Sequence, residues 1–309
     1  MEFSFKPLSN LVPLTEAPLL KGTDDPLGPL GLLRGKWSGT GFNQIWRPFF
    51  DPEYPDQHHF LELNLTVESI KFTEIDGDIP NRGLLQGDLI MHGLQYLQIV
   101  NDNFGHGLHL EPGVWLNIPA TTNPEVSATV ARLGSVPHGT SILGQGTASS
   151  EQRAPVIAPA DITAFKIGDP SDKTAFPESD LSIPTRFRSP PDLIKGITQA
   201  MVDNPNSVLT DAIANQKIIN TTNLFVTTAS TPVIGGGTAN TAFLGGGPDG
   251  PNADAAQMTA IFWIEEVEEA DGSTFLQLQY TQTVLLDFRG RSWPHVSVGT
   301  LRFMHPSGG

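Results

Sequence analysis

The chain has 309 residues, a formal net charge of −15 and no cysteine. The acidic balance disfavours binding to nucleic acid or to anionic membranes. The lack of cysteine excludes disulfides, thiolate metal centres, iron–sulfur clusters and thioether-attached haem. The first residues lack the basic segment and apolar run of a secretory signal, and no apolar stretch approaches the roughly 20 residues of a membrane span. We therefore expect a cytoplasmic protein.

The 31 glycines and 26 prolines favour many turns and short strands. Residues 1–26, rich in proline and leucine without a period, are predicted to form an N-terminal arm over the domain. Residues 27–33 are predicted to form one helical turn, placed to plug the end of a barrel. Residues 37–43 are predicted to be the first strand, with glycines that permit a bend.

Residues 60–67 form the clearest strand pattern of the chain, because apolar and polar side chains alternate along them. We expect its leucines to face the core and Glu62 and Glu68 to face water. The apolar parity changes at Ile70, which predicts a bulge or a corner. The preceding residues 46–59, which include His58 and His59, are predicted to be an exposed polar loop.

Further strand patterns follow with turn residues about every ten positions. They span residues 83–92, 94–100, 105–118, 125–133 and 140–148. This spacing is typical of an up-and-down barrel or a sandwich and not of βαβ units.

Residues 149–254 differ in composition, since prolines recur there without a period. Residues 192–218 show helical spacing interrupted at Asn204–Pro205, which predicts two short helices. Glycine-rich loops follow. We interpret the whole segment as an insertion that serves as a lid or an oligomerisation element.

The strand pattern resumes at residues 258–267 and 275–286. In the second of these, Leu278, Tyr280 and Gln282 share a face. The acidic residues around Glu265 are predicted to be a solvated strand end. The sequence thus predicts a mainly all-β protein: one antiparallel up-and-down β-barrel of eight to ten strands, formed by residues 27–148 and 255–305.

The last strand pattern, residues 292–303, places His295, Ser297 and Gly299 on one face. Two small residues beside an imidazole leave room for a flat group, where an ordinary core strand carries bulky side chains. Two interpretations remain open. His295 is either a hydrogen-bonded histidine inside the barrel or the iron ligand of a haem in its cavity.

Three segments resemble the nitrobindin-type haem-binding barrels, which belong to the calycin and fatty-acid-binding-protein-like group. They are LGPLGLLRGKWSGTG at residues 27–41, LHLEPGVW at residues 108–115 and HVSVGTLR at residues 295–302. They occur in the family's order, at the start, middle and end of the predicted barrel. The family often has two adjacent histidines where this chain has Pro294–His295. The resemblance covers the barrel alone.

The resemblance implies a calycin-like barrel that holds a b-type haem, with the iron bound by His295. Trp37, Tyr280, Ser297 and Gly299 would then lie around the cofactor, although Trp37 also suits simple core packing. Family members bind nitric oxide and isomerise peroxynitrite to nitrate, and related haem barrels act as peroxidases.

Peroxide chemistry requires a distal base and a hydrogen-bonding or cationic group near the iron. His109 and His92 are the candidate distal residues, with Arg47 as a neighbour. The alternative for His109 is a histidine in a surface turn, and His92 has a similar structural alternative.

Two other functions compete with the haem enzyme. In the first, the protein is a non-enzymatic calycin-like carrier of an apolar small ligand, and His295 is merely hydrogen-bonded. In the second, the arm and the insertion mediate self-association into a homo-oligomer. For all three functions, the acidic charge and the lack of a long apolar stretch argue against nucleic acid and membranes as partners.

Overall fold

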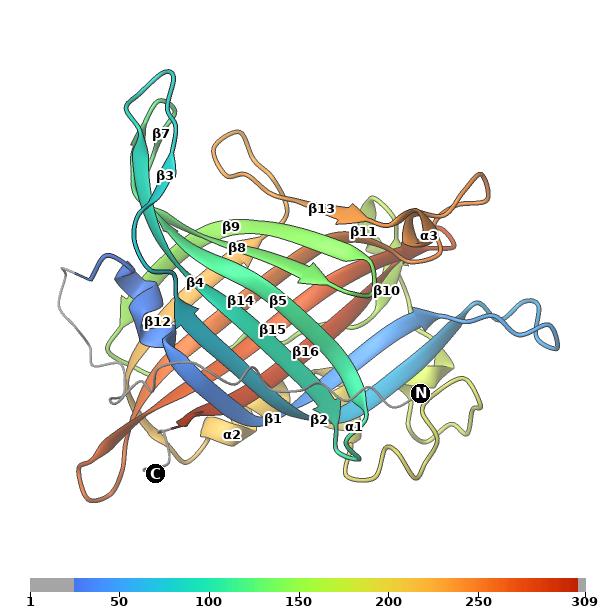
Figure 1. Cartoon of the computed structure of the whole chain (residues 1–309). Helices are drawn as coiled ribbons and strands as arrows, with labels where there is room; N and C mark the ends of the chain where they lie inside the picture. The colour runs from blue at the N-terminus through green and yellow to red at the C-terminus, as the bar shows by residue number, and fades with distance from the viewer. Residues whose placement is uncertain (1–24, 305–309) are drawn as a thin grey trace.

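The computed structural model describes residues 25–304, and ten antiparallel strands in it form a closed barrel (Figure 1). In order around the wall they are β1 (Gly35–Pro48), β2 (His59–Glu74), β4 (Leu89–Asp102), β5 (Gly107–Ile118), β8 (Thr129–Val136), β9 (Thr140–Glu151), β12 (Lys217–Thr227), β14 (Asp254–Glu268), β15 (Thr274–Phe288) and β16 (Arg291–Met304). The barrel closes because β16 also pairs with β1. The predicted all-β barrel of eight to ten strands is confirmed.

The interior is apolar at one end, where the 3₁₀ helix η1 (Gly28–Leu33) closes the barrel. Leu30 and Leu33 of η1 are fully buried in this apolar core. Trp37 packs beside them and donates a hydrogen bond from Nε1 to the carbonyl of Leu33 at 2.8 Å. The predicted plug is therefore confirmed, and Trp37 is a core residue.

Strand β2 shows that the barrel has two apolar faces in different places. Ile70 and Phe72 lie in the interior core, whereas Leu61 and Leu63 belong to a second core on the outside of the wall. The pairing of β1 with β2 continues without a register shift from residue 35 to residue 48, so the predicted bulge is absent. The parity changes because burial passes from the inner face to the outer face.

The prediction for the polar side of β2 was consequently wrong. Glu62 and Glu68, which we expected to face water, line the interior of the barrel. The leucines that we assigned to the interior face outward. Leu61 and Leu63 are nevertheless 0% exposed, because another part of the chain covers that outer face.

Residues 152–216 form this cover. They contain β10 (Ala164–Lys166), β11 (Asp169–Thr174), η2 (Pro177–Ser179), α1 (Gln199–Asp203) and α2 (Ser207–Ile213). The two helices lie on either side of the predicted break at Asn204–Pro205. Side chains from the cover and the wall form one buried cluster, which includes Phe42, Trp46, Ile162, Val202, Leu209, Trp263 and Val298.

The predicted insertion, residues 149–254, therefore has to be divided. Strand β12 lies within it and pairs with β9 and β14 in the barrel wall. We missed β12 because only Leu224 and Val226 reach the interior core, which leaves a weak alternation. Residues 228–253 follow with β13 (Gly237–Asn240) and α3 (Ala242–Gly245), and α3 lies toward the end away from η1 (Figure 1).

His59 is also placed differently from the prediction of an exposed loop. Its ring stacks on Trp293 at 4.8 Å between centroids and lies 4.4 Å from Phe176 of the cover. Its Nε2 faces Glu178 at 3.4 Å. His59 is thus part of the contact between the barrel and its cover.

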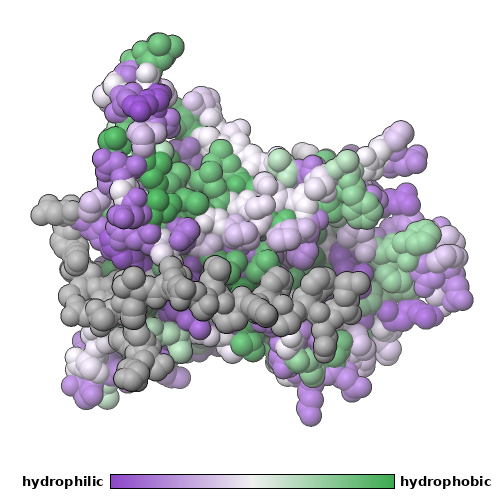
Figure 2. Space-filling model, viewed as in Figure 1, coloured by the Kyte–Doolittle hydropathy of each residue, from purple (hydrophilic) through white to green (hydrophobic). Residues whose placement is uncertain are grey.

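Two hairpins project beyond the barrel wall, and their outer tip carries apolar residues (Figures 1 and 2). They contain the short strands β3 (Ile79–Asn81), β6 (Thr121–Thr122) and β7 (Glu125–Val126). Leu84 in the first hairpin is 94% exposed. The side-chain oxygen of Gln86 accepts hydrogen bonds from the second hairpin and ties the two together. In the described part of the chain, no helix is long and apolar enough to cross a membrane.

Glu265, predicted to be solvated, is instead 0% exposed on the outer face of β14. Gln277 donates a hydrogen bond to its carboxyl at 2.7 Å, and Gln277 also bonds Gln216 at the end of the cover. Burial raises the pKa of Glu265 to about 7, and the bond from Gln277 offsets this only in part. The carboxyl is buried because the cover lies over this part of the wall.

We expect Glu265 to make the stability of the protein pH-dependent. Its pKa is raised from 4.5 to about 7 on folding. The contribution of the protonated form is therefore complete below pH 4.5 and is lost as the pH rises through about 7. The loss amounts to at most about 3 kcal/mol. Urea unfolding of wild type and Glu265→Gln at several pH values measures the difference.

Glu265→Gln should unfold at higher urea than wild type at pH 8, with the gap closing at acidic pH. Glu125→Gln, on a projecting hairpin, removes the same charge from an exposed site and serves as the control. A gap that is the same at every pH would contradict the assignment.

Candidate functional site

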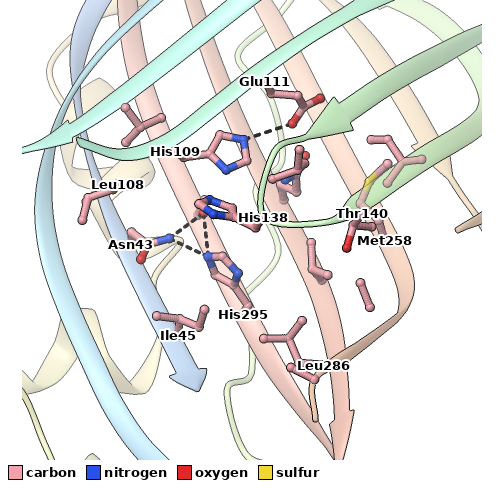
Figure 3. A pocket seen from close by; sticks show the side chains of 18 of the residues that line it. Asn43, Ile45, Leu108, His109, Glu111, His138, Thr140, Met258, Leu286 and His295 are labelled. Atoms are coloured by element: carbon pink, nitrogen blue, oxygen red, sulfur yellow. Dashed lines mark hydrogen bonds and ion pairs between the residues drawn. The ribbon is translucent and has the colours of Figure 1, made fainter. Parts of the chain in front are cut away.

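A cavity of about 330 Å³ occupies the part of the barrel interior that the apolar core leaves unfilled (Figure 3). This volume lies at the lower end of the range for small-molecule sites. Thr238, Leu244 and Ala253 of the segment after β12 also line it. Most of its wall is apolar, with Ile45, Val100, Leu108, Val136, Ile142, Met258, Val284 and Leu286.

Three histidines line the cavity, and His295 is the one that the sequence singled out. Asn43 Nδ2 donates to His295 Nε2 at 2.7 Å and to Ser297 Oγ at 2.8 Å (Figure 3). Because an amide N–H can only donate, Nε2 accepts and the ring proton lies on Nδ1. Burial, together with the charges of His109 and His138, lowers the pKa of His295 to about 3. His295 is therefore a neutral imidazole.

His109 belongs to a buried ion-pair network. Its Nε2 lies 3.1 Å from Glu111, and Arg132 Nη2 contacts the other carboxylate oxygen at 2.8 Å. Tyr96 donates its hydroxyl proton to Glu111 and accepts from Arg132. Burial raises the pKa of Glu111, but the charge of Arg132 and the hydrogen bond from His109 outweigh it and hold the pKa at about 2. Glu111 is thus ionised and fully paired.

Glu68 also lines the cavity, and its surroundings differ from those of Glu111. It accepts hydrogen bonds from Thr66 at 2.6 Å and from Tyr280 at 2.5 Å, and Gln98 Nε2 lies 3.2 Å from the Tyr280 hydroxyl. Among the described ion pairs of the cavity, a cation faces Glu62 and Glu111 but not Glu68. Burial raises the pKa of Glu68, and its hydrogen bonds offset this only in part. Of the three carboxyls that line the cavity, Glu62 and Glu111 therefore face cations, and Glu68 is the one whose pKa is raised.

Glycine pairs across neighbouring strands make room for these groups. Gly41 of β1 pairs with Gly299 of β16. A Cβ at Gly299 would lie 2.6 Å from the ring of Tyr280, and one at Gly41 would lie 2.7 Å from Glu68. Gly113 and Gly134 form a similar pair beside Tyr96 and Glu111.

This packing corrects one sequence-based inference. We expected the small residue Gly299, beside His295, to leave space for a flat ligand. The phenol ring of Tyr280 occupies that space. Gly299 is therefore small because of a neighbouring side chain.

The structure brings together four of the predicted site residues. His295, Ser297, Tyr280 and His109 all line the cavity. Arg47, which we had proposed as a neighbour, also lines it and pairs with Glu62 at 2.8 Å.

The other predicted positions lie elsewhere. Trp37 is in the apolar core. His92 is two residues beyond Leu94 of that core along β4, away from the cavity, and its Nε2 faces Asp78 at 4.0 Å. The prediction of His92 as a distal residue was therefore wrong, because β4 places His92 at the end of the barrel that η1 closes, away from the cavity.

Sequence reasoning missed His138, Asn43 and Glu68. His138 lies in the turn between β8 and β9, and nothing in its local pattern distinguishes it from a surface residue. Glu68 belongs to the alternating pattern of β2, whose polar face we assigned to the solvent, whereas it faces the interior of the barrel. Asn43 lies directly opposite Ser297 in the β1–β16 ladder, a pairing that a correct register for the closing strand would have shown.

Comparison with models of protein families, with curated proteins and with solved structures finds no match for this chain. Within residues 25–304, no three histidine, aspartate or glutamate side chains are grouped so as to hold a metal ion.

Removal of Arg132 should destabilise the barrel, because Glu111 would remain ionised and buried without its cation. We expect Arg132→Met to lower the free energy of unfolding by about 3–5 kcal/mol. The double variant Glu111→Gln/Arg132→Met should recover part of this loss, since neither charge remains. Urea unfolding at pH 7 measures both. Equal losses in the single and double variants would contradict the pairing.

Proposed function

We propose that this barrel binds one small organic molecule in its interior cavity, with the polar part of the ligand deep and the apolar part toward the end away from η1. The observation that carries the proposal is the lining of the cavity. Along their strands, Glu68, Gln98 and Glu111 follow directly on the apolar core, and Val100, Val136 and Leu286 lie farther from it, as does the Arg47–Glu62 ion pair. A few placed polar groups in a mostly apolar concavity are typical of small-molecule sites.

The polar layer offers hydrogen bonds with defined roles. Asn43 fixes the ring of His295 and the hydroxyl of Ser297 in one arrangement. Glu111 fixes the ring of His109 in the same way. Groups that are held before the ligand arrives lose little freedom on binding, which favours affinity and selectivity.

In this proposal the protein is a carrier or a receptor for its ligand, in the cytoplasm as the sequence suggested. Residues 152–216 bury their apolar side chains against the barrel wall, which supports a role within one molecule. Residues 228–253 suit the role of a lid better, because three of their side chains line the cavity.

Haem is a second candidate ligand, and His295 is the observation that favours it. A neutral imidazole on an inner wall is a competent axial ligand, so the donor fits. The Nε2 atom is held by Asn43, so that bond has to open before Nε2 can bind iron. Bound haem would supply nitric oxide binding or peroxide and peroxynitrite chemistry. His109, oriented by Glu111, would be the residue able to hold a proton there.

Filling the cavity should abolish ligand binding. We expect Val284→Trp to weaken the binding of the neutral fluorescent probe N-phenyl-1-naphthylamine at least tenfold, because the indole would occupy the cavity in its place. Fluorescence titration measures the affinity. Leu133→Trp adds the same ring on the outer wall, where Leu133 is 36% exposed, and should leave binding unchanged. Equal binding by all three proteins would exclude the cavity as the probe's site.

The haem candidate has its own test. An absorption spectrum of the protein with one equivalent of haem should show a Soret band that shifts on reduction and on addition of nitric oxide. His295→Ala should lose this band while far-UV circular dichroism remains that of a β-barrel. His92→Ala, outside the cavity, is the matched control. Unchanged haem uptake by His295→Ala would exclude His295 as the iron ligand. If the wild-type protein takes up no haem, haem is excluded and the small organic molecule remains as the proposed ligand.

A further inference from the structure

The barrel interior contains two tyrosine–glutamate pairs that are built alike but charged differently. Tyr96 with Glu111 lies against one glycine pair, and Tyr280 with Glu68 lies against the other. Arg132 keeps Glu111 ionised. Among the described ion pairs, no arginine or lysine faces Glu68, on which the charge of His109 acts. Paired carboxyls in contrasting surroundings are a known means of giving one site both an ionised group and a neutral hydrogen-bond donor.

The hydrogen bonds around the Tyr280 hydroxyl show what this contrast does. Gln98 Nε2 can only donate to the phenol oxygen. If Glu68 is ionised, the phenol proton has to point at Glu68. If Glu68 is protonated, it donates to the phenol oxygen, which then accepts two bonds. The O–H of Tyr280 then no longer points at Glu68 and can donate a hydrogen bond to a molecule in the cavity.

Tyr96 cannot act in this way. Arg132 donates to its oxygen, and the ionised Glu111 accepts its proton. Its hydroxyl is therefore fully used inside the wall. Of these two tyrosines, only Tyr280 also lines the cavity.

We propose that Tyr280, supported by a protonated Glu68, is the hydrogen-bond donor to the ligand, and that the ligand is a small neutral carbonyl compound such as a ketone or an aldehyde. This inference rests on the proposed function, because it requires a ligand in the cavity. The carbonyl oxygen of the ligand would accept this hydrogen bond beside the apolar core of the barrel.

The remaining charges of the cavity favour a neutral ligand. Glu111 contacts both Arg132 and His109, and Glu62 contacts Arg47, so each of these cations already faces a carboxylate. Burial lowers the pKa of His138 as well as that of His295. A charged ligand would lose its hydration without a counter-charge, whereas a carbonyl oxygen needs only one donor.

Glu68 has neighbours on its own strand and on five other strands of the barrel. Thr66 on its own strand, Tyr280 on β15 and Gln98 on β4 are uncharged hydrogen-bonding neighbours. Strands β1 and β16 present glycines. His109 on β5 is the charged group whose field favours ionisation of Glu68.

Infrared spectroscopy of bound acetophenone tests the inference, because its carbonyl stretch falls in frequency when the oxygen accepts a hydrogen bond. The wild-type protein should show the lowered frequency. Tyr280→Phe should return the frequency toward that in an apolar solvent and weaken binding about 2- to 12-fold, the worth of one hydrogen bond. Tyr96→Phe is the matched control and should keep the lowered frequency.

The pH dependence gives a second readout. Raising the pH ionises Glu68, the phenol proton returns to it, and the carbonyl frequency of the bound probe should rise. Glu68→Gln removes this titration, so the frequency should no longer change with pH. A Tyr280→Phe protein with the wild-type frequency, or a Glu68→Gln protein with the wild-type pH profile, would overturn the inference.

Ethylbenzene, which has the same shape without the carbonyl, separates this inference from the proposed function. Tighter binding of acetophenone than of ethylbenzene by wild type supports the inference. Equal binding of both overturns it and leaves the cavity as an apolar site. Binding of neither, in a protein whose far-UV circular dichroism shows it folded, overturns the proposed function as well.

Discussion

The structure depends on the burial of two carboxyl groups inside a barrel that has only one apolar end. A barrel of ten strands is wide enough that side chains need not fill it, and here the filling stops at a polar layer. Glu111 is tolerated because Arg132 pairs with it, and Glu68 because Thr66 and Tyr280 donate hydrogen bonds to it. The cavity begins where these carboxyls prevent apolar packing.

The outer wall follows from the same division. Strands β1 and β2 are apolar inside near η1 and apolar outside near the cavity. Where the inward side chains of these strands are polar, their apolar side chains point outward, and covering them removes apolar surface from water. The cover formed by residues 152–216 satisfies that need. The long connection between β9 and β12 is therefore a consequence of having a polar cavity inside.

Several parts of the fold could be predicted because they depend on local pattern. The plug and the break between the helices at Asn204–Pro205 came from spacing along the chain. Period-2 alternation likewise placed Tyr280 with Gln282 on one face of a strand, and His295 with Ser297 on one face of another. What failed was the face of β2, since alternation states that two faces differ without stating which one is inside.

The sequence by itself determined an acidic, cysteine-free, mostly antiparallel β protein and the alternation of each long strand. The tertiary structure decided which face of each strand is interior, that β12 completes the wall, and that His109, His138 and His295 meet in one cavity. It also decided that the space beside Gly299 belongs to Tyr280. The physical reason is that these features depend on contacts between strands far apart in the chain, which arise only when the barrel closes.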